Sequence, residues 1–293
     1  FNLLLKEWDL VHVIQVTPLP PAIVAGKIKR KSVVYHMLDV YEDSIFLPRS
    51  VRNFCVAIDK LLMRLVDAVI LVDEEQVLEI DGIPNQSVTT IYDSPETIHP
   101  IVHKQKSNDI FTIFFAGQLN SGKKLNLDKM IQAVTEVEGV KLIFAGYGNL
   151  VPEIRQAALL QPNKIEYIGE IPHFEVLQRS AEADLLFVLR DPILLVNRYI
   201  CGSKILEAMM CGTAIMVSEG TSTAKKVKKY DMGIVVNPHN IDEIKRALSD
   251  LVNNPDLCSY YGQNAARAHK NCYNWGAQEK KLLDLYRQVL GPY

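Results

Sequence analysis

The sequence predicts an α/β protein of two domains, each built on a doubly wound parallel β-sheet. Short apolar runs typical of buried strands alternate with helical stretches along nearly all of the 293 residues. This alternation lapses over residues 93–109 (DSPETIHPIVHKQKSND), where Pro, His and Lys accumulate as in a linker. We therefore expect an N-terminal domain over residues 1–100 and a second domain over residues 101–277.

The first domain shows the alternation four times. Strands are expected over residues 9–16, 32–37, 68–72 and 87–92, and helices over residues 22–30, 51–66 and 73–80. Strands that are separated by helices pair in parallel and are covered by helices on both faces. The loop after the second strand carries polar residues, among them Asp39.

The second domain is predicted to be Rossmann-like. Six short strands are expected over residues 111–116, 141–145, 165–168, 185–189, 214–217 and 234–236, with helices between them. Helices are also expected over residues 241–252, 256–268 and 278–290. The helix over residues 278–290 carries a broad apolar stripe, so we expect it to cross through a loop over residues 270–276 and join the first domain. The alternative is that this helix covers the second domain.

Composition excludes several classes of protein. The net charge of -2 gives no general attraction to nucleic acid. Residues 1–100 hold 9 Lys and Arg against 14 Asp and Glu, whereas residues 101–293 hold 23 against 20, which favours the second half for an anionic ligand. Five widely spaced cysteines indicate neither a disulfide framework nor a zinc site, so we expect a cytoplasmic protein. No apolar run approaches the roughly 18 residues of a membrane span.

Glycines and charged residues follow the strands of the second domain. Ligands of such sheets bind where the strands end, so these residues are candidates for a binding site. The loop that begins at Gly117 leads to Lys123, and the second strand ends in Gly146 and Gly148, where the missing Cβ atoms would let a ligand approach the backbone. A third glycine is missing, so an NAD site is disfavoured and ordinary turns are the alternative.

A short helix over residues 204–211 carries the most specific signal. We expect Ser203 as its N-cap and Gly212 as its end. Lys204 and Glu207 are three residues apart and share one face, beside a helix N-terminus that suits a phosphate. A carboxylate can accept hydrogen bonds from sugar hydroxyls, so the pattern indicates nucleotide-sugar binding. The alternative is an ordinary surface ion pair.

Four segments carry a resemblance to a known family: FAGQLNSGKKL, LIFAGYG, IEYIGEIPHFEVLQRSAEADLLFVL and SKILEAMMCGTAIMVS. They resemble GT-B glycosyltransferases of the family-4-like group, the glycosyl transferases group 1. The resemblance implies two Rossmann-like domains that face each other across a cleft. The first half resembles the acceptor domain of that fold but lacks its opening strands, and the chain opens on Phe1, so we expect it to begin inside a longer gene product.

The resemblance also implies a site. Glu207 would bind the ribose hydroxyls, Lys123 and the backbone at Gly202 and Ser203 the diphosphate, and Ile171 would border the base. Tyr199 and Gln118 depart from the family pattern, which has an acid and an arginine there, and Lys204 would supply the missing positive charge. The nucleotide-binding set is Gly117, Gln118, Lys123, Gly146, Gly148, Ile171, Tyr199, Gly202, Ser203, Lys204 and Glu207. In the first half, Asp39 and His36 fall near the catalytic cleft, and a structural role is the alternative for His36.

The function implied is transfer of a sugar from a nucleoside diphosphate sugar to a hydroxyl of a glycan or lipid-linked glycan. The resemblance implies retention of the anomeric configuration. We expect no required metal, because the cations and a helix N-terminus would stabilise the departing diphosphate. We further expect a cytoplasmic location at the inner face of the membrane, with peripheral membrane contact and no nucleic acid partner. The alternative is a non-catalytic or partner-dependent nucleotide-sugar-binding subunit.

Overall fold

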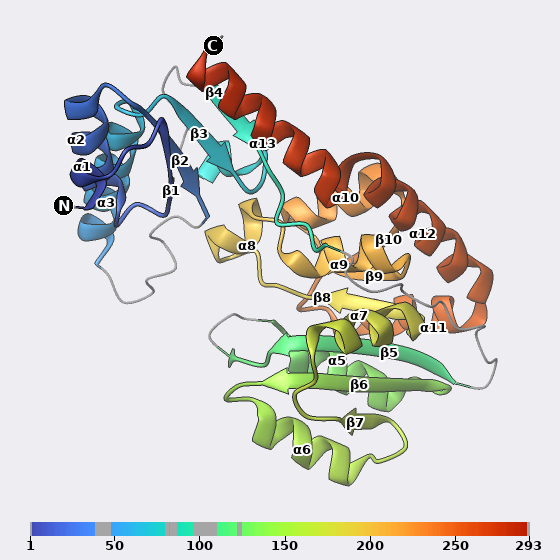
Figure 1. The fold of residues 1–293 in the computed structure, drawn as a ribbon. Coiled ribbons are helices and arrows are strands. Elements are labelled where there is room, and N and C mark those ends of the chain that lie inside the picture. The colour runs from blue at the N-terminus through green and yellow to red at the C-terminus, as the bar shows by residue number, and fades with distance from the viewer. Residues whose placement is uncertain are drawn as a thin grey trace. The chain divides into compact units, whose positions relative to one another are not determined.

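The computed structural model divides the chain into two compact units (Figure 1). It describes residues 2–38, 48–79, 82, 87–96, 110–121 and 125–291. Unit 1 comprises Phe1–Asp93, Leu194–Cys201 and Trp275–Tyr293, and unit 2 comprises Ser94–Ile193 and Gly202–Asn274. Within the described residues, the structure contains no helix with the length and apolarity needed to cross a bilayer.

Unit 1 is built on sheet A, a four-stranded parallel sheet in the order β1-β2-β3-β4. Its strands are β1 (Leu10–Ile14), β2 (Ser32–Met37), β3 (Ala68–Leu71) and β4 (Ser87–Thr90). Its helices are α1 (Asn2–Leu5), α2 (Leu19–Lys29), α3 (Arg49–Met63), α4 (Gln76–Glu79), α8 (Leu195–Tyr199) and α13 (Trp275–Leu290). The alternation of side chains along each strand gives the sheet two apolar faces.

Different helices cover the two faces of sheet A. On one face Val33, Tyr35 and Met37 of β2 pack in a cluster with residues of α2 and α3. On the other face Val34 packs with Leu285 of α13, together with Ala68, Ile70 and Ile91. The C-terminal helix therefore completes the core of a domain that begins more than 200 residues earlier in the chain.

The segment Leu194–Cys201 belongs to unit 1, although the sequence places it in the second domain. The buried Asp73 explains this, because its Oδ2 accepts a hydrogen bond from the Cys201 backbone N–H at 2.8 Å. The loop expected over residues 270–276 is also wrong. A π-helical segment, η3 (His269–Tyr273), continues α12. The Asn274 side-chain amide donates hydrogen bonds to the carbonyls of His269 and Lys270 at the end of this segment, and α13 starts at the next residue, Trp275.

Unit 2 is built on sheet B, a six-stranded parallel sheet in the order β10-β9-β8-β5-β6-β7. Its strands are β5 (Phe111–Gln118), β6 (Val140–Tyr147), β7 (Ile165–Tyr167), β8 (Leu185–Val188), β9 (Ala214–Ser218) and β10 (Gly233–Val236). Its helices are α5 (Leu127–Glu136), α6 (Val151–Leu160), α7 (His173–Glu182), α9 (Ser203–Cys211), α10 (Ser222–Tyr230), α11 (Ile241–Asn253) and α12 (Pro255–Ala268). The six expected strands are confirmed to within a few residues.

The strand order of sheet B fixes where a ligand would bind. From β5 the chain moves outward to β6 and β7, then returns to β8 on the opposite side of β5 and continues to β9 and β10. In doubly wound sheets, ligands bind at the carboxyl ends of the strands where the order reverses. Here that point lies beside the end of β5.

Candidate functional site

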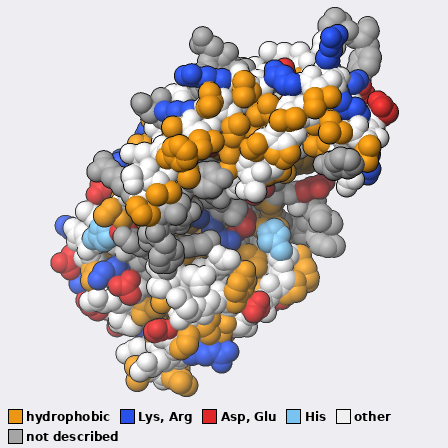
Figure 2. Space-filling view, turned by 90° about the vertical axis from the view of Figure 1, so that its left-hand side faces the viewer, with side chains coloured by type: hydrophobic (Ala, Val, Ile, Leu, Met, Phe, Trp, Pro, Cys, Tyr) orange, Lys and Arg blue, Asp and Glu red, His pale blue; other side chains and the backbone are white. Residues whose placement is uncertain are grey.

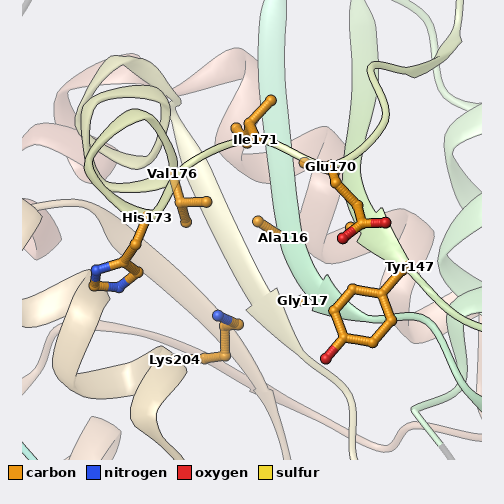
Figure 3. A pocket seen from close by; sticks show the side chains of 10 residues that line it. Ala116, Gly117, Tyr147, Glu170, Ile171, His173, Val176 and Lys204 are labelled. Carbon is orange, nitrogen blue, oxygen red and sulfur yellow. The ribbon is translucent and has the colours of Figure 1, made fainter.

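A pocket of about 200 Å³ opens at the carboxyl ends of β5 and β6 (Figure 3). Its lining comes from these strands, from the loop between β7 and α7, and from α7 and α9: Ala116, Gly117, Ala145, Gly146, Tyr147, Glu170, Ile171, His173, Val176 and Lys204. In Figure 3 the Lys204 ammonium and the His173 ring lie on one side of the pocket, and Tyr147 and Glu170 lie on the other. The strand ends named by the sequence therefore converge on one site, which lies within unit 2.

Lys204 reaches the end of β5 because Gly117 has no side chain. A Cβ on Gly117 would lie 3.2 Å from Lys204 Cε, and the φ of +148° also disfavours other residues there. Gly146 is the register partner of Gly117, and a Cβ on it would lie only 1.9 Å from the Gly117 carbonyl oxygen. The space expected for a ligand above Gly146 is thus occupied by β5, so this glycine serves the packing of the two strands.

Lys204 and Glu207 form an ion pair, with 2.9 Å between Lys204 Nζ and Glu207 Oε2. It differs from an ordinary surface pair, because the Glu207 side chain is only 7% exposed. A buried carboxylate costs free energy unless it is paired, so Lys204 stabilises Glu207 at this position.

His173 is a third charged or polar group at this place, and sequence reasoning missed it. Its Nε2 lies 3.6 Å from Glu207 Oε1, and its side chain is 62% exposed. It is the first residue of α7, directly after Ile171 and Pro172. That position, where a strand loop meets a helix start on the binding edge of the sheet, is the signal by which the sequence could have identified it.

The start of α9 differs from the expectation. Gly202, not Ser203, is the N-cap, and no side chain caps this helix. The Arg190 side chain lies close to this position, because a Cβ on Gly202 would lie 2.7 Å from Arg190 Nη2. Ser203 is exposed as the first helical residue. The helix ends at Gly212 in the left-handed conformation, as the sequence predicts.

The remaining predicted nucleotide-binding residues are placed differently. Ile171 lines the pocket, and Gln118 at the end of β5 donates a hydrogen bond to the Tyr147 hydroxyl at 3.3 Å. Gly148 is outside the pocket lining, and a Cβ on it would lie 2.3 Å from the Leu119 carbonyl oxygen. Tyr199 lies on α8 in unit 1. Lys123 lies outside the described residues.

In unit 1, His36 lies near the end of β2, and Asp39 lies outside the described residues. The His36 ring is 5.3 Å from the ring of His12, whose Nδ1 is 2.6 Å from the Tyr286 hydroxyl. Burial, and secondarily His12, lowers the pKa of His36 to about 4, so the ring is neutral at pH 7. Its Nε2 is buried and has no hydrogen-bond partner among the described residues. This environment favours a structural role for His36.

Metal binding and a reactive cysteine thiol find little support in the described part of the chain. It contains no cluster of three or more His, Cys, Asp or Glu that could hold a metal ion. The buried Cys211 follows Glu207 by one turn of α9, and burial together with the Glu207 carboxylate raises the pKa of its thiol to about 12. A thiol with such a pKa stays protonated and unreactive near neutral pH.

Solved structures are similar to this chain in fold. HepE of Anabaena, in complex with UDP, has a TM-score of 0.79 and 16% sequence identity, over 96% of this chain and 79% of that chain. Sucrose-phosphate synthase of Thermosynechococcus elongatus has a TM-score of 0.74 and 15% identity, over 96% of this chain and 74% of that chain. With the two parallel sheets, these likenesses confirm a GT-B-like fold.

Two curated relatives are similar in sequence, both uncharacterized glycosyltransferases of Methanocaldococcus jannaschii. One is 26% identical over an alignment of 196 positions, which covers 64% of this chain and 47% of the relative. The other is 24% identical over an alignment of 234 positions, which covers 73% of this chain and 57% of the relative. The chain thus spans about half the length of the curated relatives it matches.

The match to a protein family covers residues 99–268 and therefore more than half of the chain. It includes sheet B and every residue of the pocket at the ends of β5 and β6. The family is described as glycosyl transferases group 1, which is the family that the four sequence segments resemble. The chain belongs to the glycosyl transferases group 1 family.

Proposed function

We propose that this chain binds a nucleoside diphosphate sugar in the pocket of unit 2 and transfers the sugar to a hydroxyl acceptor. The observation that carries the proposal is the position of Lys204. Its ammonium lies in the pocket beside Gly117, one residue into a helix whose N-terminus has no side-chain cap. A cation and the positive end of a helix together suit the diphosphate of such a donor.

Each part of the donor would contact a different set of residues around Lys204. Lys204 has three N–H donors and gives one to Glu207, so two remain for phosphate oxygens. Glu207 would accept hydrogen bonds from the ribose hydroxyls, and Ile171 would contact the base with its apolar side chain. Lys123 and the backbone at Gly202 and Ser203 complete the proposed diphosphate site. The likeness to HepE, whose structure was solved in complex with UDP, supports this class of ligand.

Catalysis would rest on stabilisation of the departing diphosphate. Negative charge develops on its leaving oxygen, and Lys204, Lys123 and the α9 N-terminus would stabilise that charge. Because these groups supply positive charge, the proposal requires no metal. Retention of the anomeric configuration and a glycan or lipid-linked acceptor belong to the proposal, as do Asp39 on the acceptor side and a cytoplasmic location at the membrane. His36 is left out of the proposed catalytic set, because its environment favours a structural role. For Asp39 the support is its position in the sequence, two residues after the end of β2.

A binding subunit without activity of its own is the second candidate. One feature favours it: Tyr199 and Gln118 stand where the family pattern has an acid and an arginine. A partner would then complete the acceptor side. Donor binding would be the same in both cases, so binding alone does not separate them.

Calorimetry with UDP, GDP and ADP tests the donor site. The diphosphate that binds is then compared with its parent nucleoside on the wild-type chain, Lys204→Ala and Lys228→Ala, the last an exposed lysine on α10. Loss of a charged hydrogen bond costs about 1.5 to 3 kcal/mol. Lys204→Ala should therefore lower the affinity for the diphosphate roughly 10- to 100-fold and the affinity for the nucleoside much less. Equal losses for both ligands would refute the phosphate role of Lys204.

Product analysis then separates the two candidates. The wild-type chain is incubated with the matching nucleotide sugar and a panel of glycan and lipid-linked acceptors, with and without EDTA, and the anomeric configuration of any product is read by NMR. The enzyme proposal expects a retained product in both conditions. Donor binding without turnover on any acceptor would favour the binding subunit.

A further inference from the structure

A short loop forms one wall of the pocket at the ends of β5 and β6. It connects β7 to α7, and the structure fixes it at both ends. The Gly169 carbonyl accepts a hydrogen bond from the Gly146 N–H at 2.8 Å, and Pro172 is the N-cap of α7. The two residues between these fixed points, Glu170 and Ile171, both line the pocket. The loop therefore presents these two side chains from a fixed backbone.

Glu170 brings a carboxylate to this wall. In Figure 3 the carboxylate lies on the Tyr147 side of the pocket, across from the Lys204 ammonium and the His173 ring. Within the described residues its oxygens have no hydrogen-bond or ion-pair partner, whereas Glu207 is paired with Lys204 at 2.9 Å. The Glu170 side chain is also exposed, so its carboxylate is available to a ligand.

The pocket thus carries opposite charges on opposite walls. The strands of sheet B end on the left of Figure 1, and Figure 2 shows that side, where unit 2 carries both acidic and basic side chains. A diphosphate is attracted by the Lys204 ammonium and repelled by the Glu170 carboxylate. A nucleoside diphosphate should therefore bind with its phosphates beside Lys204 and its base toward Glu170.

The side chains next to Glu170 suit a flat, aromatic base. Tyr147 is 51% exposed, so its ring is accessible to a base, and Ile171 adds an apolar contact. The Tyr147 hydroxyl accepts a hydrogen bond from the Gln118 side chain at 3.3 Å, which helps to orient the ring. Stacking on an aromatic ring favours every base to a similar degree. Tyr147 therefore supplies affinity, and the choice of base falls to Glu170.

We propose that Glu170 selects a guanine base, so that the donor of this chain is a guanosine diphosphate sugar. The inference rests on the proposed function of the pocket and names the base of its donor. A carboxylate only accepts hydrogen bonds, and its two oxygens can bind two neighbouring donors at once. Guanine presents two such donors on one edge, the N1–H and the N2 amino group.

The other common bases offer a single donor group on that edge. Adenine and cytosine carry an amino group beside an unprotonated ring nitrogen, which would face the second carboxylate oxygen as one acceptor against another. Uracil carries one N–H between two carbonyl oxygens, and a carboxylate repels both of them. A site that is built to bind a hydrogen-bonding group discriminates strongly against ligands that lack this group. The Glu170 carboxylate should therefore disfavour all three of these bases.

Calorimetry on the whole chain tests this selection. We expect GDP to bind roughly tenfold or more tightly than UDP, ADP and CDP, because guanine alone among these bases can make both hydrogen bonds. Inosine diphosphate lacks the N2 amino group, so it should bind roughly tenfold more weakly than GDP. UDP that binds as tightly as GDP would overturn the inference.

Glu170→Gln tests the carboxylate itself. The side-chain amide keeps one acceptor and gains a donor, so the variant should bind GDP roughly tenfold more weakly. It should bind xanthosine diphosphate more tightly than the wild type does, because xanthine carries a carbonyl oxygen in place of the N2 amino group and the amide can donate to it. Glu170 is exposed, so the melting temperature should stay unchanged. A variant that binds both diphosphates as the wild type does would show that Glu170 is only a solvated surface residue.

Two further variants separate the base inference from the donor site. Tyr147→Ala should lower the affinity for GDP, UDP, ADP and CDP by one common factor of roughly tenfold. Glu153→Gln changes another exposed glutamate, on α6 and outside the pocket lining, and should leave every affinity unchanged. If the four diphosphates bind equally well and Lys204→Ala weakens them all, the donor site stands and the base inference fails. If none of them binds, both fail.

Discussion

Unit 1 and unit 2 share one architecture but treat polar side chains differently. In unit 2, Lys204 and Glu207 meet at the carboxyl edge of sheet B, beside a pocket. In unit 1, His12 and His36 lie together beside Tyr286 of α13, and burial lowers the pKa of both imidazoles. Unit 2 thus holds a paired, partly accessible site at its strand ends, whereas unit 1 holds a half-buried pair of imidazoles with lowered pKa values.

The units also differ in how they close their cores. Unit 2 uses two stretches of chain, residues 94–193 and 202–274, whereas unit 1 also needs α8 and α13 from distant parts of the sequence. Unit 1 therefore depends on contacts that close long loops. Such contacts cost more conformational entropy than local ones. The stability of unit 1 should therefore be the more sensitive of the two to substitutions in α8 and α13.

The largest effect that we expect is from Leu285→Ala in α13. Leu285 is 2% exposed and packs with Val34, Ala68 and Ile70 of sheet A. Its truncation should destabilise unit 1 by about 2 to 5 kcal/mol, because it removes buried methyl groups and leaves a cavity. Hydrogen exchange by mass spectrometry should show faster exchange in β1 to β4 and unchanged exchange in sheet B.

Leu283→Ala is the control for this comparison. Leu283 lies on the same helix but is 43% exposed, so its truncation should change stability far less. If Leu285→Ala accelerated exchange in β5 and β6 as strongly as in unit 1, the two units would not unfold separately and the contrast between them would fail.

Glu207→Ala should have the next largest effect, on binding. Hydrogen bonds to a charged group contribute about 1.5 to 3 kcal/mol, so the affinity for the nucleoside diphosphate should fall by that amount in calorimetry. Glu175→Ala removes a carboxylate from α7 that pairs with Arg179 at 3.6 Å, and it should leave affinity unchanged. A melting temperature that falls more than the affinity would show that the buried Glu207 only supports α9.

Asp59→Asn tests the burial of polar groups in unit 1. Burial raises the pKa of Asp59 from 3.8 to about 6, so the folded chain at pH 8 holds a carboxylate that the unfolded chain solvates better. The variant should then be more stable than the wild type by about 1 to 2 kcal/mol. This gain should shrink as the pH falls from about 6 toward 3.8, because Asp59 becomes neutral in both states.

Denaturant unfolding of both chains over this pH range measures the effect. The half-buried His12 and His36, with lowered pKa values, make both chains less stable as the pH falls below 6.5, and this common effect cancels in the difference. A gain that stays constant down to pH 4 would show that burial does not raise the pKa of Asp59, because the folded and unfolded chains would then bind its proton equally.

The strands and the binding edge of unit 2 could be predicted from the sequence because both depend on local patterns. Apolar runs define the strands, and Lys204 and Glu207 share a helix face by their spacing alone. The roles of Gly146 and His173 could not be predicted in this way. Gly146 is required by the approach of the Gly117 carbonyl, and His173 meets Glu207 through the packing of α7 on α9. Asp73 likewise holds Cys201 across 128 residues of sequence, which no local pattern reveals.

The smallest expected effect compares two helix starts at the edge of sheet B. Thr221 caps α10, where its Oγ1 accepts the Ala224 N–H at 3.0 Å, whereas α9 starts at Gly202 without a side-chain cap. Thr221→Ala should therefore cost about 1 kcal/mol in the free energy of unfolding, and Ser203→Ala close to none. Denaturant unfolding measures both variants. If Thr221→Ala left the free energy of unfolding unchanged, or if Ser203→Ala lowered it as much, the two helix starts would not differ. The N–H groups of α9 would then not be kept without a side-chain cap for a ligand.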